Sequence, residues 1–159
     1  LKDGTPVPVM AGLNPITIDP QNGWLYFGPM AAGKISRIPL DKIGNITLKP
    51  EDMGQYVEPY ADKPASDGMT IDAQGNIYLT SVNTGEIGII DYKTWQYRTY
   101  LKDARLVWPD GFAFGPDGML YVTINQLHKA AALNLGKEEG VKPYLVARFK
   151  PVVMGTIGR

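Results

Sequence analysis

The stretch Trp108–His128, WPDGFAFGPDGMLYVTINQLH, contains two Asp-Gly pairs, which begin at Asp110 and Asp117. An apolar run follows the first pair, and a second run, centred on Tyr121, follows the other. Because Asp-Gly favours the tight turns of β-hairpins, the stretch predicts short antiparallel strands. The spacing leaves open whether both aspartates serve only as turn residues.

The pattern of this stretch occurs three times along the chain, each time as a strand, a turn and an aromatic-centred strand. The segments are LNPITIDPQNGWLYFG (13–28), SDGMTIDAQGNIYLTS (66–81) and PDGFAFGPDGMLYVTI (109–124). Their central tyrosines, Tyr26, Tyr78 and Tyr121, lie 52 and 43 residues apart. Separations of this size are typical of propeller blades and too long for most solenoid repeats.

Two further strands are expected after each pair, which gives the four antiparallel strands of a propeller blade. These additional strands are predicted at 34–40 and 55–60, at 86–92 and 95–101, and at 130–135 and 142–149. The sequence therefore predicts an all-β fold with three four-stranded blades, at roughly 13–62, 64–103 and 108–150. One short helical turn or loop is expected at 49–53.

Three blades are too few to close a ring, since propellers have about four to eight. Open flanks would expose apolar surface and unpaired strand edges. We therefore expect this single domain to be half of a six-bladed propeller. An N-terminal half absent from this sequence, or a second copy of the chain, would complete it.

The composition bounds the function before any site is considered. The 159 residues are 44% hydrophobic, which supports a packed core. Sixteen basic residues balance sixteen acidic ones, so no charge excess favours nucleic acid or an acidic membrane. Cysteine is absent, which excludes disulfides and thiolate chemistry. No apolar run approaches the ~18 residues of a membrane span.

The residues that lead the three inner strands carry side-chain oxygens. They are Asn14, Asp67 and Asp110, and the propeller repeat would bring them to equivalent places around one tunnel. Carboxylate and amide oxygens suit a divalent cation such as calcium. The alternative is that all three cap turns through their own backbone, and spacing alone leaves both readings open. At the other end of these strands, Asp19, Asp72 and Asp117 are expected to be turn residues.

The three segments, and WPDG…GMLYVTINQLH above all, resemble the major royal jelly protein/Yellow family, particularly its bacterial relatives. More distantly, the chain resembles the gluconolactonase/senescence-marker group. The resemblance covers nearly the whole chain and implies the C-terminal half of a six-bladed propeller that is secreted or periplasmic. It further implies a small organic ligand in the central tunnel.

The resemblance also assigns residues. Asp110 takes the place of an aspartate that holds the tunnel metal in the lactonases, and Asn14 and Asp67 take two asparagine places, with Asp67 a departure. A glutamate ligand would lie in the absent N-terminal half. Asn125 falls at a ligand contact of amine-binding members, although it could be a plain loop residue. Leu127 replaces an aromatic contact, which argues against stacking of an amine.

Two further residues near the tunnel mouth are candidates for ligand contact. His128, the single histidine, could shuttle protons or simply pack at a blade rim. Trp108 enters the inner strand, whereas Trp24 and Trp95 are expected to pack between blades. Three functions stay open: a small-molecule-binding propeller, a metal-dependent hydrolase or isomerase, and a protein-interaction scaffold.

Overall fold

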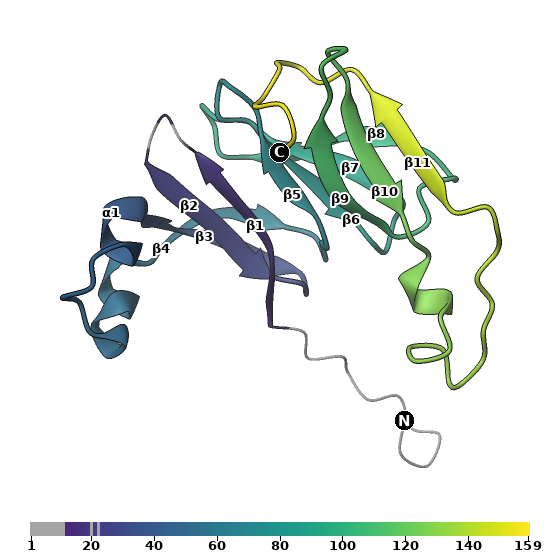
Figure 1. Ribbon diagram of the computed structural model, residues 1–159, viewed down its shortest axis with the longest axis horizontal. Coiled ribbons are helices and arrows are strands. Elements are labelled where there is room, and N and C mark those ends of the chain that lie inside the picture. Colours follow the sequence, from purple (N-terminus) through teal and green to yellow (C-terminus); the bar gives the residue numbers. More distant parts are fainter. Residues whose placement is uncertain (1–11, 20, 22) are drawn as a thin grey trace.

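The computed structural model describes residues 12–19, 21 and 23–159, which form three antiparallel sheets in chain order (Figure 1). Blade 1 has the strand order β1 (Leu13–Asp19), β2 (Trp24–Pro29), β3 (Gly33–Pro39) and β4 (Glu58–Lys63). Blade 2 comprises β5 (Met69–Ile71), β6 (Ile77–Ser81), β7 (Glu86–Ile90) and β8 (Tyr97–Lys102). Blade 3 comprises β9 (Pro109–Phe114), β10 (Leu120–Ile124) and β11 (Leu145–Phe149).

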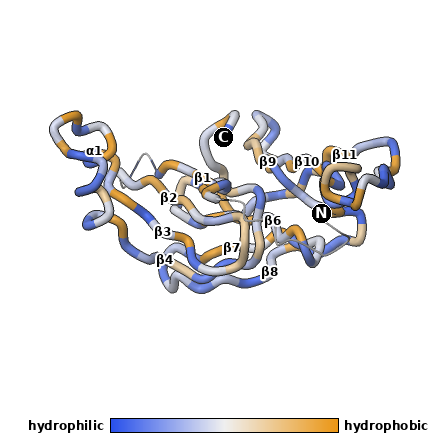
Figure 2. Tube along the Cα trace, turned by 90° about the horizontal axis from the view of Figure 1, so that it is seen from below, coloured by the Kyte–Doolittle hydropathy of each residue, from blue (hydrophilic) through white to orange (hydrophobic). Residues whose placement is uncertain are grey.

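The first strand of each blade lies on the inside of the arrangement. Strand β5 contacts β1 on one side and β9 on the other, while the outer strands β4 and β8 also meet. Seen from below, the three sheets follow one another as an open arc (Figure 2). The all-β propeller fold predicted from the repeat is confirmed.

The repeat is visible in the strand register. Tyr26 pairs with Thr17, Tyr78 with Thr70, and Tyr121 with Ala113, always between the first and second strands of a blade. The three tyrosines therefore occupy equivalent positions in their blades. Tyr26 is buried against blade 2 and Tyr78 against blade 3. Tyr121 holds the same position in the last blade but is partly exposed, and its hydroxyl donates to Oδ2 of Asp117 at 2.7 Å.

The aspartates expected in the hairpin turns do bond to the turn backbone. Oδ1 of Asp19 accepts the N–H of Gln21 at 2.9 Å. Oδ1 of Asp72 accepts the N–H of Gln74 at 2.9 Å, and Oδ1 of Asp117 accepts that of Met119 at 3.3 Å. Asx side chains commonly bond the backbone two residues ahead, as they do here.

The prediction of a fourth strand in blade 3 was wrong. Residues 130–135 form turns, in which the N–H of Leu133 bonds to Ala130 O and that of Gly136 to Ala131 O. Leu135 and Gly136 both have positive φ, at 54° and 79°, which ends any extended run. Alanine-rich sequence has low strand propensity, so the apolar run closes on itself. Strand β11 takes the third place in the sheet instead.

Short helices occupy the connections. Helix α1 (Leu40–Ile43) is a single turn, and η1 (Pro50–Tyr56) is a 3-10 helix where 49–53 was expected to turn. Pro50 suits the first helical position because its missing N–H would have no partner there. A third, η2 (Leu127–Lys129), follows β10. Among the described residues, none of these helices has the length and apolar character needed to cross a membrane.

The segment after β11 returns across the turn ends of blades 2 and 3. Gly155 bridges to Asp72, and Ile157 bridges to Phe114. The N–H of Val152 donates to the hydroxyl of Tyr78 at 2.7 Å. This segment therefore ties the two blades together at the end opposite to the inner-strand starts.

Candidate functional site

The starts of the three inner strands meet at one end of the fold, because β1, β5 and β9 lie side by side. Asn14 lies in β1, Asp67 lies two residues before β5, and Asp110 lies in β9. Nδ2 of Asn14 donates to Oδ1 of Asp67. A Cβ added to Gly68 would lie 1.9 Å from the carbonyl oxygen of Asp110, so the entries of blades 2 and 3 are in direct contact. The structure brings the three predicted residues to one end of the fold, with the side chains of Asn14 and Asp67 bonded to each other.

In blades 2 and 3, a threonine near the end of the second strand accepts a hydrogen bond from the glycine that follows Asp67 or Asp110. Oγ1 of Thr80 accepts the backbone N–H of Gly68 at 2.8 Å. Oγ1 of Thr123 accepts the N–H of Gly111 at 3.1 Å, which is the same bond one blade later. Sequence reasoning missed this role, although both threonines follow the central tyrosine by two residues.

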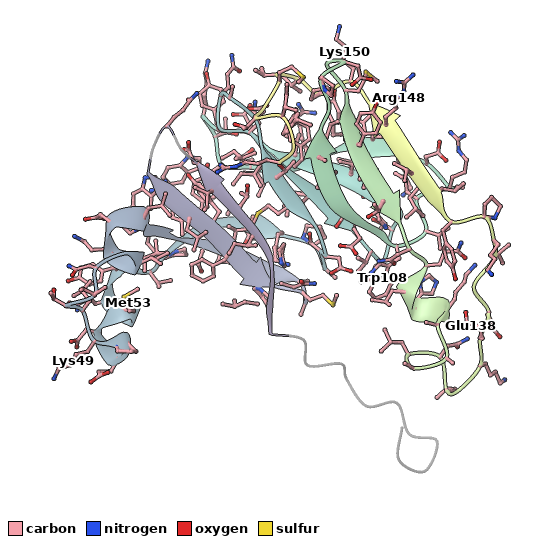
Figure 3. All side chains as sticks on the ribbon, viewed as in Figure 1. Lys49, Met53, Trp108, Glu138, Arg148 and Lys150 are labelled. Atoms are coloured by element: carbon pink, nitrogen blue, oxygen red, sulfur yellow. The ribbon has the colours of Figure 1, made fainter. Side chains whose placement is uncertain are left out.

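Trp108 and Asn125, which bracket the first hairpin of blade 3, hold the two carboxylates. The indole Nε1–H of Trp108 donates to Oδ2 of Asp67 at 2.6 Å. Nδ2 of Asn125 donates to Oδ2 of Asp110 at 2.8 Å (Trp108 is labelled in Figure 3). The backbone joins the two residues as well, since the N–H of Asn125 bonds to Trp108 O at 3.2 Å. Two of the four residues predicted to contact a ligand, Trp108 and Asn125, therefore hydrogen-bond to residues predicted to bind a metal.

The remaining two candidates lie on η2. The ring of His128 stacks on that of Trp108, with centroids 5.5 Å apart and an interplanar angle of 17°. Leu127 donates its backbone N–H to Oδ1 of Asn125 at 2.9 Å and so fixes that amide. Leu127 thus contributes its backbone to the cluster.

Two residues around the cluster adopt left-handed backbone conformations that are uncommon outside glycine. Trp108 has φ 57° and Gln126 has φ 54°. Sequence reasoning missed Gln126, whose side chain is buried. Its Nε2 donates to the carbonyl oxygen of Val141 at 2.7 Å, and its Oε1 accepts the backbone N–H of Val141 at 3.1 Å. Such backbone strain is often found at functional sites, where the surroundings hold it in place.

The electrostatics of the cluster favour a positively charged occupant. Asp110 is partly buried, and burial together with the negative charge of Asp67 raises the pKa of its carboxyl above the usual range. The hydrogen bond from Asn125 opposes this shift. The two negative charges therefore repel each other, and a bound cation would relieve the repulsion.

The donor chemistry suits a hard cation in kind. Two carboxylates and an amide group offer the oxygen ligands that calcium prefers, out of the about six to eight it takes. Within the described part of the chain, no three His, Cys, Asp or Glu side chains are grouped so as to hold a metal. The cluster Asn14, Asp67 and Asp110 therefore offers three oxygen-bearing side chains, fewer than the number of ligands that calcium takes.

Comparison with solved structures places this fold among propeller proteins. Regucalcin from Agrobacterium tumefaciens, a calcium-binding protein, is similar with a TM-score of 0.62 at 24% identity, over 92% of this chain and 48% of that one. A gluconolactonase from Xanthomonas campestris gives 0.62 at 14% identity, over 94% and 47%. A luciferin-regenerating enzyme gives 0.60 at 18% identity, over 94% and 48%. These likenesses show the fold, and the chain spans about half the length of each structure.

Sequence comparison identifies the family. No curated protein sequence matches the chain. The family described as major royal jelly protein matches residues 2–156, which include all three blades and the cluster at their inner-strand starts. This chain therefore belongs to the major royal jelly protein family.

Proposed function

We propose that the assembled propeller binds a small organic molecule with a positive charge at the tunnel mouth, through Asp67 and Asp110. The observation that carries this proposal is the pair of neighbouring carboxylates, one on each of two blades, each held by a donor from blade 3. Charge, rather than aromatic stacking by residue 127, then selects the ligand, since Leu127 provides no ring.

Trp108 and Asn125 act as positioning residues in this account. Each donates one hydrogen bond to a carboxylate, at 2.6 Å and 2.8 Å, and so orients it before the ligand arrives. Hydrogen bonds to charged groups are among the stronger ones in proteins, which makes this support effective. The exposed ring of His128 stacks on the ring of Trp108. A site whose side chains are already oriented loses less conformational entropy when it binds a ligand.

A second candidate is a metal-dependent hydrolase of the lactonase type. It is favoured by the convergence of oxygen-bearing side chains at Asn14, Asp67 and Asp110. Two solved proteins of similar fold are described as a calcium-binding protein and as a gluconolactonase. When bound, a divalent cation would polarise a carbonyl group and lower the pKa of a bound water. The role of this chain would be to hold the cation through the two carboxylates and to orient them through Trp108 and Asn125.

Export from the cytoplasm and completion of the ring to six blades are parts of the same proposal. Family resemblance supports the export, and comparison of the periplasmic and cytoplasmic fractions of a bacterial host would test it. The open arc of three blades and the half-length coverage of the propellers that it resembles support the completion.

Isothermal titration calorimetry would test the binding proposal on the chain in its assembled form. The probes are tyramine, a small aromatic amine, and calcium chloride. Asp67→Asn is expected to weaken tyramine binding by about tenfold or more, because one of two attracting charges is lost. Asp117→Asn, a matched change in a turn at the other end of β9, should leave binding unchanged. Tyramine affinity that survives Asp67→Asn would refute the amine proposal. Calcium binding without tyramine binding would favour the second candidate.

A further inference from the structure

A cavity of about 420 Å³ is lined in part by Trp108, whose indole N–H bonds to Asp67 of the carboxylate cluster. One wall is the β6–β7 hairpin at 82–85, and the other is the segment 102–107 that leads from β8 to β9. The rings of Trp108 and His128 complete the lining. Its volume lies within the ~300–1,000 Å³ typical of small-molecule sites. Neither Asp67 nor Asp110 lines it, so the cavity is distinct from the proposed cation site.

The walls of the cavity are held in place before any ligand binds. Gly85 has φ +65°, and a Cβ there would lie 3.0 Å from the carbonyl oxygen of Leu106. The N–H of Asp103 bonds to Gly85 O at 3.4 Å, and that of Leu106 to Asp103 O at 3.0 Å. Leu106 is buried beneath this contact. Trp108 is fixed in turn by its hydrogen bond to Asp67. The hairpin and the segment are therefore joined to each other across the base of the cavity.

The charges that line the cavity are already neutralised within the chain. Nζ of Lys102 pairs with Oε1 of Glu86 at 2.7 Å. The guanidinium of Arg105 donates twice to the carboxylate of Asp103, at 2.9 Å and 2.7 Å. An ion entering the cavity would have to compete with these partners. The lining therefore favours an uncharged ligand.

The corresponding place in blade 1 is closed, which provides an internal comparison. Lys63 pairs with Gly33 at the start of the third strand of blade 1, and Lys102 pairs with Glu86 at the same position in blade 2. The two lysines are therefore equivalent. Lys63 is only 5% exposed, and its Nζ donates to Ala31 O at 2.7 Å and to Pro64 O at 2.9 Å. Its side chain thus joins the hairpin to the following segment. In blade 2 the acidic residue opposite draws the lysine outward, and the space between hairpin and segment remains open.

Polar groups and one aromatic wall decide the class of ligand. The exposed side chains of Asn83 and Thr84 offer an amide and a hydroxyl, while Lys102 and Asp103 stay paired with Glu86 and Arg105. A sugar ring presents C–H faces that pack on an indole and hydroxyls that bond to such groups. We propose that this cavity binds a neutral saccharide of one or two rings, with a ring lying against Trp108.

Two-dimensional NMR of the assembled chain would test the saccharide site. The probes are methyl β-D-glucopyranoside and maltose at millimolar concentrations. We expect saturable shifts of the Trp108 indole N–H and of the backbone amides of Asn83 and Thr84. Ala104→Trp, which places a bulky ring in the cavity, should weaken binding by about tenfold or more. Ala32→Trp is the matched control, an equally exposed alanine on the β2–β3 hairpin, and should leave binding intact.

Further outcomes separate this inference from the proposed function. Asn83→Ala, which changes no packing in the core, should also weaken saccharide binding and covers the case in which Ala104→Trp fails to fold. Asp110→Asn should leave saccharide binding unchanged, since its carboxylate does not line the cavity. Saccharides that produce no saturable shift, or affinities that neither Ala104→Trp nor Asn83→Ala alters, would overturn the inference.

Discussion

The indole N–H of Trp108 and the carboxylate of Asp67 form a 2.6 Å hydrogen bond across 41 residues of chain. The bond joins the entry of blade 3 to that of blade 2. The same indole belongs to both proposed ligand sites, because it bonds to the carboxylate cluster and lines the cavity. The position of this one ring therefore affects both proposals.

Trp108→Phe keeps an aromatic ring but removes the donor to Asp67. We expect binding of a cationic probe to weaken by about three- to tenfold, since the carboxylate loses the group that orients it. Trp95→Phe is the matched control, because Trp95 also has a positive φ but contacts Tyr60 of blade 1 and is 47% exposed. Calorimetric titration of both variants makes the comparison. Equal affinities in the two would show that the indole N–H does not position Asp67.

Gly155→Ala should destabilise the fold through the segment that ties blades 2 and 3. An added Cβ would lie 2.4 Å from Cε2 of Phe114 and 2.8 Å from the carbonyl oxygen of Ile71. Overpacking of this kind costs about 1–3 kcal/mol in the free energy of unfolding. Gly54→Ala is the control, because a Cβ there meets nothing within 4 Å. Urea denaturation should separate the two variants, and equal midpoints would show that the segment is loosely held.

Lys63 should make stability depend on pH in the alkaline range. Burial lowers the pKa of its ammonium from 10.5 to about 8. Between these values the unfolded chain binds the proton and the folded chain does not, so this residue makes the free energy of unfolding rise with pH. Below about pH 8 both states are protonated and the contribution is flat. Relative to Lys63→Met, the wild type should gain stability from pH 8 to pH 10 in urea titrations. A constant difference between the two proteins would contradict the lowered pKa.

The open flanks should drive association of the chain. On blade 1, Leu13 and Ile16 are 71% and 58% exposed, and on blade 3 Val146 is 67% exposed. Exposed apolar strands of this kind favour contact with another sheet. Sedimentation velocity should therefore show a dimer or a larger assembly at micromolar concentration. A stable monomer across the concentration range would count against completion of the ring by a second copy.

The features that follow from local pattern could be predicted from the sequence. The spacing of Tyr26, Tyr78 and Tyr121 indicated the blades, and the register confirms that the three are equivalent. The turn aspartates followed from the bonding habit of Asx residues. In blade 3, however, the apolar sequence at 130–135 did not indicate that Leu135 and Gly136 adopt left-handed backbone conformations, which exclude a strand there.

Contacts between distant residues could be predicted only in part. The repeat brought Asn14, Asp67 and Asp110 to one end of the fold, as expected. The partners of these carboxylates could not be foreseen, because the bond from Trp108 to Asp67 depends on how two blades pack. The same holds for Gly155, whose place against Phe114 depends on the return of the last segment across the sheet.

The central claim is that Asp110 belongs to a cation-binding cluster, and thermal unfolding of wild type and Asp110→Asn tests it most directly. Both proteins are heated in the assembled state with and without calcium or tyramine, alongside Asp117→Asn as the turn control. A cation that binds only the folded state stabilises it by RT ln(1 + [L]/Kd). The account predicts that at least one of the two cations raises the midpoint of the wild type and of Asp117→Asn, and that Asp110→Asn loses the increase. An unchanged wild-type midpoint with both cations, or an equal increase in Asp110→Asn, would contradict it.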